Sequence, residues 1–193
     1  MHTINDPIVP FALPICETLL PGSRIAIHGK CHFHHGHSQD FAIELLSESD
    51  ILLIADFRFK HGPHKEHNLI VNSCIDKVWG TEIKQANPIH HNDNFVVTVE
   101  VHDRHYSVAI NGFTVASLNH RAPYQNVRAV GVKGQANIEK IHFEGFSNYD
   151  SWSGNHTTHN THYIGYGTET FNPSAFKQNR SNDHFCTDND YGI

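Results

Sequence analysis

The sequence predicts an all-β fold, because short strand patterns follow one another, turn signals separate them and no sustained helical period is present. Apolar and polar residues alternate at period two over residues 95–101 and again over residues 106–110. Asn111-Gly112 follows the second stretch and is typical of a tight hairpin turn before a further strand at residues 114–118. Short strands with closely spaced turns favour a two-sheet sandwich or a barrel over a sheet with crossover helices.

The remaining strands, and the end of the domain, follow from the distribution of apolar residues. Further strands are expected at residues 24–28, 41–46, 51–59, 68–71, 127–132 and 138–146. Residues 1–147 are therefore expected to form one domain. Residues 148–193 are rich in Asn, Thr, Ser, Gly and His, and they lack the aliphatic pattern needed to offset the entropy of ordering. We predict a polar, disordered tail there, with local docking points at Trp152 and at residues 163–166.

Composition argues against several functional classes. The 193-residue chain has a formal net charge of −6 and no run of lysines and arginines, so no nucleic-acid partner is expected. No apolar run approaches the roughly 18 residues of a membrane-spanning helix, and the N-terminus lacks the basic start and apolar core of a signal peptide. We therefore expect a cytoplasmic protein without membrane insertion. The 4 cysteines, none of them in a CxxC pair, are expected to be reduced thiols.

Three neighbouring strand candidates place polar residues on one predicted sheet face. In the stretch ILLIADFRF, alternate residues form a core set, and the residues between them face outward. The stretches LIVN and VWGTEIK continue the outward set, which comprises Asp56, Arg58, Asn72, Trp79, Glu82 and Lys84. A flat indole can cover the weakly apolar C–H face of a pyranose, while the other side chains offer hydroxyls their donors and acceptors. The patch therefore predicts a sugar-binding site.

The sequence resembles the galectins, the β-galactoside-binding lectins. The stretches LPGSRIAIHGK, FAIEL, IADFRF, LIVN, VWGTEIK, HYSVAINGF and the late HR occur in family order and spacing over residues 8–146. The resemblance implies a jelly-roll sandwich of two antiparallel sheets that binds β-galactosides or related glycoconjugates without a metal or cofactor. It also implies glycoprotein partners, either a monomer or a homodimer, and export from the cytoplasm by a route independent of a signal peptide.

The family's sugar-contacting pattern is only partly present. Four residues match it: Arg58, Asn72, Trp79 and Glu82. Ile54 stands where the family has a histidine, Asp56 where it has an asparagine, and Lys84 where it has a second arginine.

These three departures affect how galactose would be recognised. The family's histidine and arginine read the axial 4-hydroxyl of galactose. A hydroxyl pressed against Ile54 forfeits a hydrogen bond, at a cost of about 1–3 kcal/mol. Asp56 can only accept hydrogen bonds and can pair with Arg58, while Lys84 lacks the planar fork of arginine. We expect weakened or altered glycan specificity. The alternative is a galectin fold that has lost sugar binding and acts as a protein-interaction module.

The 19 histidines form the remaining unusual feature, concentrated in HGKCHFHHGH and KHGPHKEH. Their spacing matches no closed set of four metal ligands, so we interpret them as exposed loop residues and predict no metal site. Two alternatives stay open: a metal-linked histidine protein, and replacement of the missing site histidine by His61 or His64 from a loop. No residue pattern is typical of an activated nucleophile, and an aspartate beside an arginine stays ionised. We therefore predict no catalytic residue and no enzymatic activity.

Overall fold

The computed structural model describes residues 1–35, 39–60 and 63–152 of the chain. Within these ranges there are thirteen strands and one short 3₁₀ helix, η1 (Tyr124–Asn126). The strands are β1 (His2–Asn5), β2 (Phe11–Pro14), β3 (Arg24–Cys31), β4 (Asp40–Leu46), β5 (Ile51–Arg58), β6 (Asn68–Ile75), β7 (Val78–Trp79), β8 (Ile83–Ala86), β9 (Asn94–Val101), β10 (His105–Ile110), β11 (Phe113–Asn119), β12 (Ala129–Gly134) and β13 (Ala136–Glu144). In the described part of the chain, no helix has the length and apolar character needed to cross a membrane.

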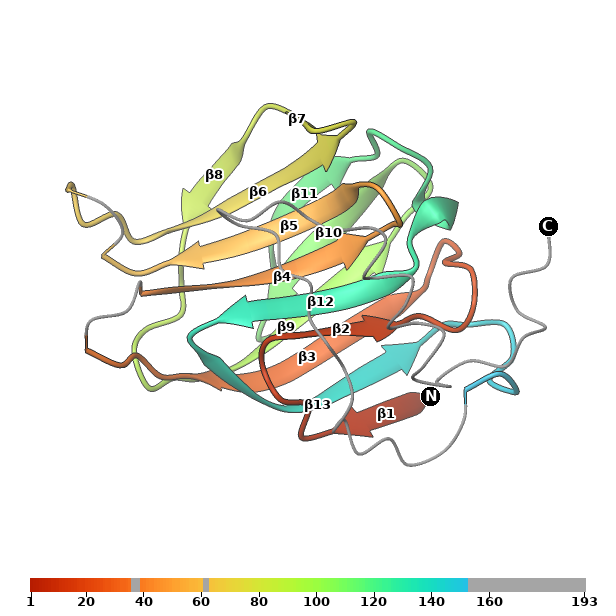
Figure 1. Cartoon of the computed structure of the whole chain (residues 1–193), viewed down its shortest axis with the longest axis horizontal. Helices are drawn as coiled ribbons and strands as arrows, with labels where there is room; N and C mark the ends of the chain where they lie inside the picture. The colour runs from red at the N-terminus through yellow and green to blue at the C-terminus, as the bar shows by residue number, and fades with distance from the viewer. Residues whose placement is uncertain (36–38, 61–62, 153–193) are drawn as a thin grey trace.

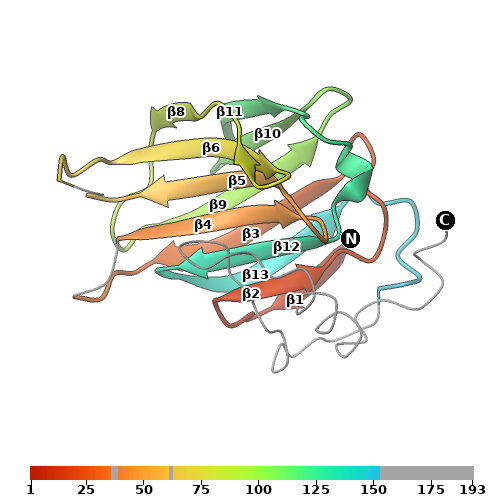
Figure 2. The same ribbon diagram turned by 45° about the horizontal axis from the view of Figure 1, so that its top comes forward.

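The strands form two antiparallel sheets that face each other as a sandwich (Figures 1 and 2). One sheet has six strands in the order β1-β13-β3-β9-β10-β11. The other has seven strands in the order β2-β12-β4-β5-β6-β7, and β8 pairs with β6 beyond the end of β7. Consecutive strands such as β1 and β2 lie in different sheets, so the chain crosses between the layers. The predicted all-β, two-sheet sandwich is confirmed.

The core lies between the two sheets and consists of the inward-facing side chains of their strands. At its centre the ring of Phe41 stacks on those of Phe57 and Phe95, with ring centroids 4.6 and 4.9 Å apart. Cys31 and Cys74 are buried free thiols, as expected. Cys16 is disulfide-bonded, so the expectation of a reduced thiol is wrong at that position.

Two tight hairpin turns fix the register of the strands near the candidate site. Asn111 and Gly112 both have positive φ values, 50° and 87°, which suits the two-residue turn that the sequence predicts between β10 and β11. Asp76 and Lys77 also have positive φ values, 51° and 65°, and they join β6 to β7. This second turn places Trp79 directly opposite Cys74. The left-handed backbone of the β6–β7 turn therefore sets which face of the sheet carries the indole.

The observed elements depart from the predicted ones mainly at their ends. The strand predicted at residues 68–71 continues to Ile75 as β6, and the short strands β1 and β2 were not predicted. Past residue 147, the buried Trp152 donates a hydrogen bond from Nε1 to Glu17 Oε2 at 2.7 Å and packs 4.8 Å from the ring of Phe143. Trp152 thus docks on the sandwich. Residues 148–152 are therefore ordered, contrary to the prediction for the start of the tail, and residues 153–193 lie outside the described residues.

Candidate functional site

The predicted polar patch lies on the outer face of the seven-stranded sheet, across β5, β6, β7 and β8. Directly opposed residues of antiparallel strands point to the same side of a sheet. Three such pairs bring the outward residues of the patch together: Ile54 with Asn72, Ile70 with Lys84, and Cys74 with Trp79. The sheet register therefore places the strand residues of the predicted site on one face, as the sequence indicated.

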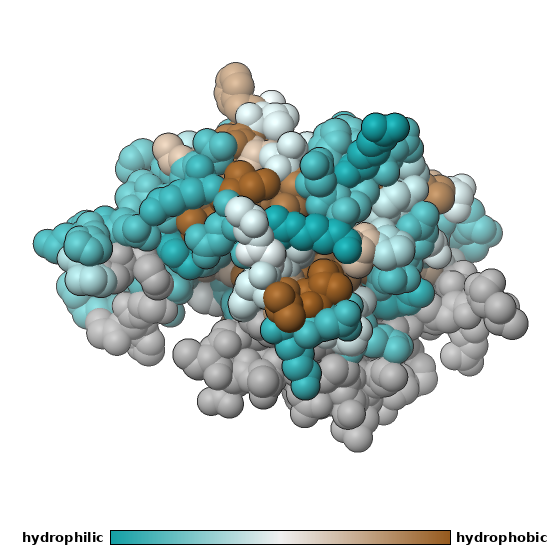
Figure 3. Space-filling model, turned by 90° about the horizontal axis from the view of Figure 1, so that it is seen from above, coloured by the Kyte–Doolittle hydropathy of each residue, from teal (hydrophilic) through white to brown (hydrophobic). Residues whose placement is uncertain are grey.

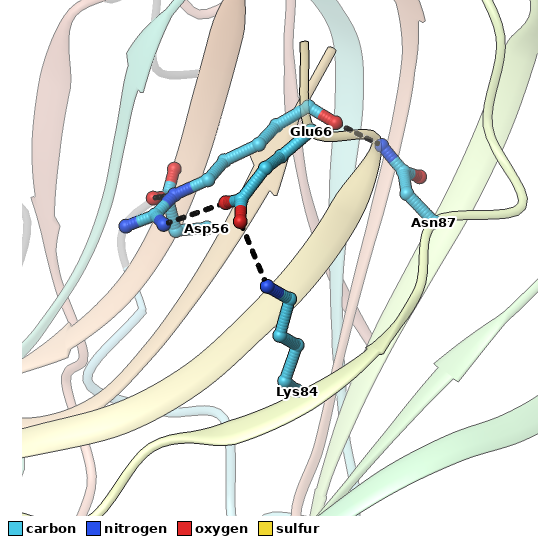
Figure 4. Close-up of polar contacts among 5 residues, drawn as sticks. Asp56, Glu66, Lys84 and Asn87 are labelled. Carbon is cyan, nitrogen blue, oxygen red and sulfur yellow. Dashed lines mark hydrogen bonds and ion pairs between the residues drawn. The ribbon is translucent and has the colours of Figure 1, made fainter. Parts of the chain in front are cut away.

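A charged network runs along this face (Figure 4). Arg58 donates from Nε to Asp56 Oδ2 at 2.8 Å, which confirms the predicted pairing of these two residues. The Nη1 atom of Arg58 lies 3.9 Å from Glu66 Oε2, and Lys84 donates from Nζ to Glu66 Oε1 at 2.9 Å. The hydrogen bond from Lys84, followed by one from Asn68, lowers the pKa of Glu66. The network is thus a row of alternating charges that can offer a ligand both donors and acceptors.

Glu66 is a site residue that sequence reasoning missed. It lies in the connection between β5 and β6, where no strand alternation indicates the direction of a side chain. Glu82, which the sequence placed in the site, is exposed in the connection between β7 and β8. On this face the carboxylate that pairs with Lys84 therefore comes from Glu66 (Figure 4). The backbone of Arg58 is held in turn by Asn87, whose Nδ2 donates to the Arg58 carbonyl oxygen at 3.2 Å.

Trp79 presents its indole at the edge of the same sheet. Its side chain is 44% exposed, so part of the ring surface is open to a ligand. Figure 3 looks onto this edge, where a mostly hydrophilic surface is interrupted by apolar spots. A half-exposed indole beside a charged network matches the aromatic floor and hydroxyl readers predicted for a sugar site.

Asn72 holds the backbone next to Trp79 in place. Its side chain is almost fully buried, and its Nδ2 donates to the Gly80 carbonyl oxygen at 3.0 Å. Its Oδ1 accepts from the backbone N–H of Ser73 at 2.8 Å and from Arg121 Nη1 at 2.5 Å. Both ends of the amide are therefore engaged within the protein, which gives Asn72 a structural role at the site.

Arg121 is the second residue whose role sequence reasoning missed. It lies between β11 and η1, and its Nη1 donates to Asn72 Oδ1 and to Ser73 Oγ, the latter at 3.0 Å. Its Nη2 donates to the Thr81 carbonyl oxygen at 2.6 Å. A Cβ added at Gly80 would lie 2.1 Å from Arg121 Nη1, so the guanidinium occupies the space that glycine leaves. The sequence offered the HR pair as its only signal, without indicating a role.

Ile54 shows how the other half of the face differs. It is buried and belongs to an apolar cluster on this face, formed by Ala12, Ala42, Leu46, Ile51, Ile54, Cys74 and Ala129. Beside this cluster the fully buried Glu44 pairs with Lys133 at 3.0 Å. The sheet therefore presents an alkyl group where the family pattern has a histidine.

The histidine-rich segments do not form a metal centre in the described ranges. There, no group of three His, Cys, Asp or Glu side chains lies close enough to hold a metal ion. His64 is exposed in the connection between β5 and β6, and His61 lies outside the described residues. Ile54 occupies the position opposite Asn72.

Comparison with known proteins agrees with this geometry. The family model for galactoside-binding lectin matches residues 10–143. The probable galaptin lec-8 of Caenorhabditis elegans is 40% identical over 181 residues, which cover 94% of this chain and 97% of that protein. The probable galaptin lec-7 of the same organism is 34% identical over 176 residues, covering 91% of this chain and 95% of that protein.

Solved structures show the same fold. The galectin LEC-6 of Caenorhabditis elegans superposes with a TM-score of 0.67 at 22% identity, over 75% of this chain and 96% of that one. Sheep galectin-11 superposes with a TM-score of 0.61 at 18% identity, over 70% of this chain and 97% of that one. These likenesses show that the two-sheet sandwich is the fold of the galectins. The chain therefore belongs to the galactoside-binding lectin family, the galectins.

Proposed function

We propose that the protein is a lectin that binds β-galactosides or related glycans with weakened or altered specificity. The observation that carries this proposal is the half-exposed indole of Trp79 on the same sheet face as the network of Arg58, Glu66 and Lys84. An indole covers the C–H face of a pyranose, and the charged groups meet its hydroxyls. The proposed binding residues are Asp56, Arg58, Asn72, Trp79, Glu82 and Lys84, to which we add Glu66.

The altered specificity follows from how this network is already paired. Asp56 engages Nε of Arg58 and leaves other N–H groups of the guanidinium for a hydroxyl. Lys84 brings a single ammonium in place of a planar fork, so it can contact one oxygen in many directions. Ile54 offers no hydrogen bond to an axial 4-hydroxyl, which removes about 1–3 kcal/mol of discrimination for galactose. We therefore expect weaker binding and a smaller preference for galactosides over related sugars.

The proposal includes the setting in which the lectin acts. We infer binding without catalysis and without a bound cofactor, with glycans of glycoproteins as partners and no role for nucleic acid or membrane insertion. One domain over residues 1–147 carries the site, and a homodimer would present two sites. The protein is proposed to be cytoplasmic, with export independent of a signal peptide. The second candidate is a protein-interaction module that has lost sugar binding, which the alkyl side chain of Ile54 on the proposed sugar face favours.

A glycan array with the full chain tests these two candidates against each other. The lectin proposal expects binding that lactose competes away. Trp79→Ala should abolish this glycan binding, because the indole that stacks on the sugar ring is lost. Phe113→Ala is the matched control, because Phe113 is also a large exposed aromatic, at 77%, on the β10–β11 hairpin. Silence across the array from a folded wild-type protein would reject the lectin proposal and support the protein-interaction module.

A further inference from the structure

A second pocket lies at one end of the sandwich and is not part of the proposed sugar site. Its cavity volume is about 500 Å³, and it opens where the β3–β4, β5–β6 and β8–β9 connections meet. Five of its lining residues are histidines: His34, His35, His67, His90 and His91. Phe59, which also lines it, faces the core, whereas the preceding Arg58 projects from the outer face of the sheet. The pocket therefore opens at the end of the core.

Aromatic rings form much of the wall of this pocket. The ring of Phe33 lies 4.6 Å from that of Phe59 and stacks on His91 with centroids 5.2 Å apart and planes 20° apart. The ring of His67 meets Phe59 edge-on at 5.2 Å and stacks on His90, also at 5.2 Å. These rings offer a flat, apolar surface that suits a planar ligand.

The polar groups of the pocket favour a negatively charged ligand. Lys60 is its permanent cation, and none of the described residues that line it is acidic. Imidazoles gain a positive charge as the pH falls through about 6.5, the ordinary range of histidine. His32 stacks on His91 at 5.6 Å, lies 5.0 Å from His34, and extends the group of imidazoles.

Two carboxylates lie at the margin of the pocket. Asp93 approaches His90 Nδ1 to 3.5 Å and also accepts a hydrogen bond from the His90 backbone N–H. Glu66 precedes His67 but accepts a hydrogen bond from Lys84 on the sheet face. These two carboxylates are fewer than the six basic side chains, five imidazoles and Lys60, that line the pocket.

We propose that this pocket binds a small organic anion with a flat apolar body, such as an aromatic carboxylate, and that binding tightens as the surrounding imidazoles become protonated. The planar body stacks among Phe33, Phe59 and His91, and the anionic group faces Lys60 and the remaining imidazoles. Because the bound anion favours the charged form of each imidazole, binding takes up protons from solution. The residues that line this pocket differ from the proposed sugar-binding residues.

Calorimetry on the full chain with benzoate tests the proposal. Benzoate should bind about tenfold more tightly at pH 5.5 than at pH 7.5, because nearby positive charge strengthens binding of an anion. The heat at pH 6.5 should vary with the ionisation enthalpy of the buffer, which reports proton uptake. Benzamide, which has the ring without the charge, and sulfate, which has charge without the ring, should each bind about tenfold more weakly than benzoate. Equal affinity for benzoate and benzamide, or for benzoate and sulfate, would overturn the proposed ligand class.

Two variants and a competition experiment locate the binding. His91→Gln and His67→Gln each remove an imidazole from the wall and should weaken benzoate binding severalfold at pH 5.5. His105→Gln is the matched control, because His105 stacks on His102 at the far end of the six-stranded sheet and should leave the affinity unchanged. Saturating lactose should also leave it unchanged. An effect of His105→Gln as large as that of His91→Gln, or displacement by lactose, would show that benzoate binds elsewhere and overturn the assignment.

Discussion

The two halves of the outer sheet face are stabilised in different ways. Around β6, β7 and β8, hydrogen bonds from Asn72 and Arg121 hold the backbone next to Trp79. Around β4 and β5, the face consists of the apolar cluster that includes Ile54, and of Arg58, which Asp56 already engages. The first half keeps an aromatic platform in position. In the second half, Ile54 stands in place of the histidine of the family pattern, and Arg58 is already paired with Asp56.

Under the proposed function, this difference predicts that the position of Trp79 and the specificity of glycan binding can change separately. The contacts that position Trp79 are internal, and Asn72 and Ser73 are both almost fully buried, so altering them disturbs folding as well as binding. Ile54 sits among alkyl side chains, and its exchange for another residue leaves the hydrogen bonds of Asn72 intact. Substitutions in the two halves should therefore separate stability from selectivity.

The largest expected effect comes from removing Arg121, whose hydrogen bonds hold the backbone next to Trp79. Arg121→Ala leaves the Thr81 carbonyl and Ser73 Oγ without their charged donor and removes one donor from Asn72. We expect the free energy of unfolding to fall by about 2–4 kcal/mol, measured by urea denaturation. Glycan binding should be lost at the same time, because the connection that carries Trp79 is no longer fixed.

A second substitution tests whether the position of the guanidinium matters. Gly80→Ala keeps Arg121 but introduces a Cβ 2.1 Å from its Nη1, so the side chain has to move. The variant should lose glycan binding as Arg121→Ala does. If Gly80→Ala binds glycan as the wild type does, the idea of Arg121 as a positioning residue for the platform is refuted.

The fold followed from the sequence wherever local chemistry determines it. Alternation at period two located β9 and β10, and Asn111-Gly112 located the turn that follows, because both signals act over a few residues. The full length of β6 was not predicted, because its second half contains Asn72 and Ser73, residue types that are common in loops. Their hydrogen bonds come from distant parts of the chain, and no local pattern reports them.

The candidate site was predictable to the extent that it lies on strands. The register brought Asn72, Trp79 and Lys84 to one face, as their positions in the sequence indicated. Glu66 and Arg121 could not be assigned in the same way, because both lie in connections between strands. The hydrogen bond from Arg121 to Asn72 spans 49 positions of the sequence, and it exists only once the sheets are assembled.

The next largest effect is expected on the affinity for lactose, when Ile54 is replaced. Ile54→His restores a ring that can donate and accept at the position opposite Asn72. We expect lactose to bind about five- to tenfold more tightly, consistent with one recovered hydrogen bond of about 1–1.5 kcal/mol. Because the imidazole enters an apolar cluster, the free energy of unfolding should fall by about 1–2 kcal/mol. Calorimetric titration and urea denaturation measure the two effects.

Ile54→Val is the matched control for that gain. It shortens the side chain without adding a polar group, and it should cost about 0.5–1.5 kcal/mol of stability while leaving lactose affinity unchanged. Equal affinities of the histidine and valine variants would mean that the alkyl group at position 54 does not limit galactoside binding.

The smallest effect on stability is expected from replacing Lys84, an exposed residue of the charged network. Lys84→Ala removes the hydrogen bond that lowers the pKa of Glu66, so this pKa should rise in the variant. A carboxylate with a lowered pKa in the folded state stabilises the protein above its unfolded pKa, and that contribution disappears as the pH falls through the lowered value. The variant should therefore be slightly less stable than the wild type at pH 7 and equally stable in strong acid.

Carbon NMR of the Glu66 carboxyl group during an acid titration measures the shift of its pKa, with Lys140→Ala on β13 as the control. An unchanged Glu66 pKa in Lys84→Ala would mean that the pair does not form in solution, and that Lys84 is free to meet a glycan hydroxyl.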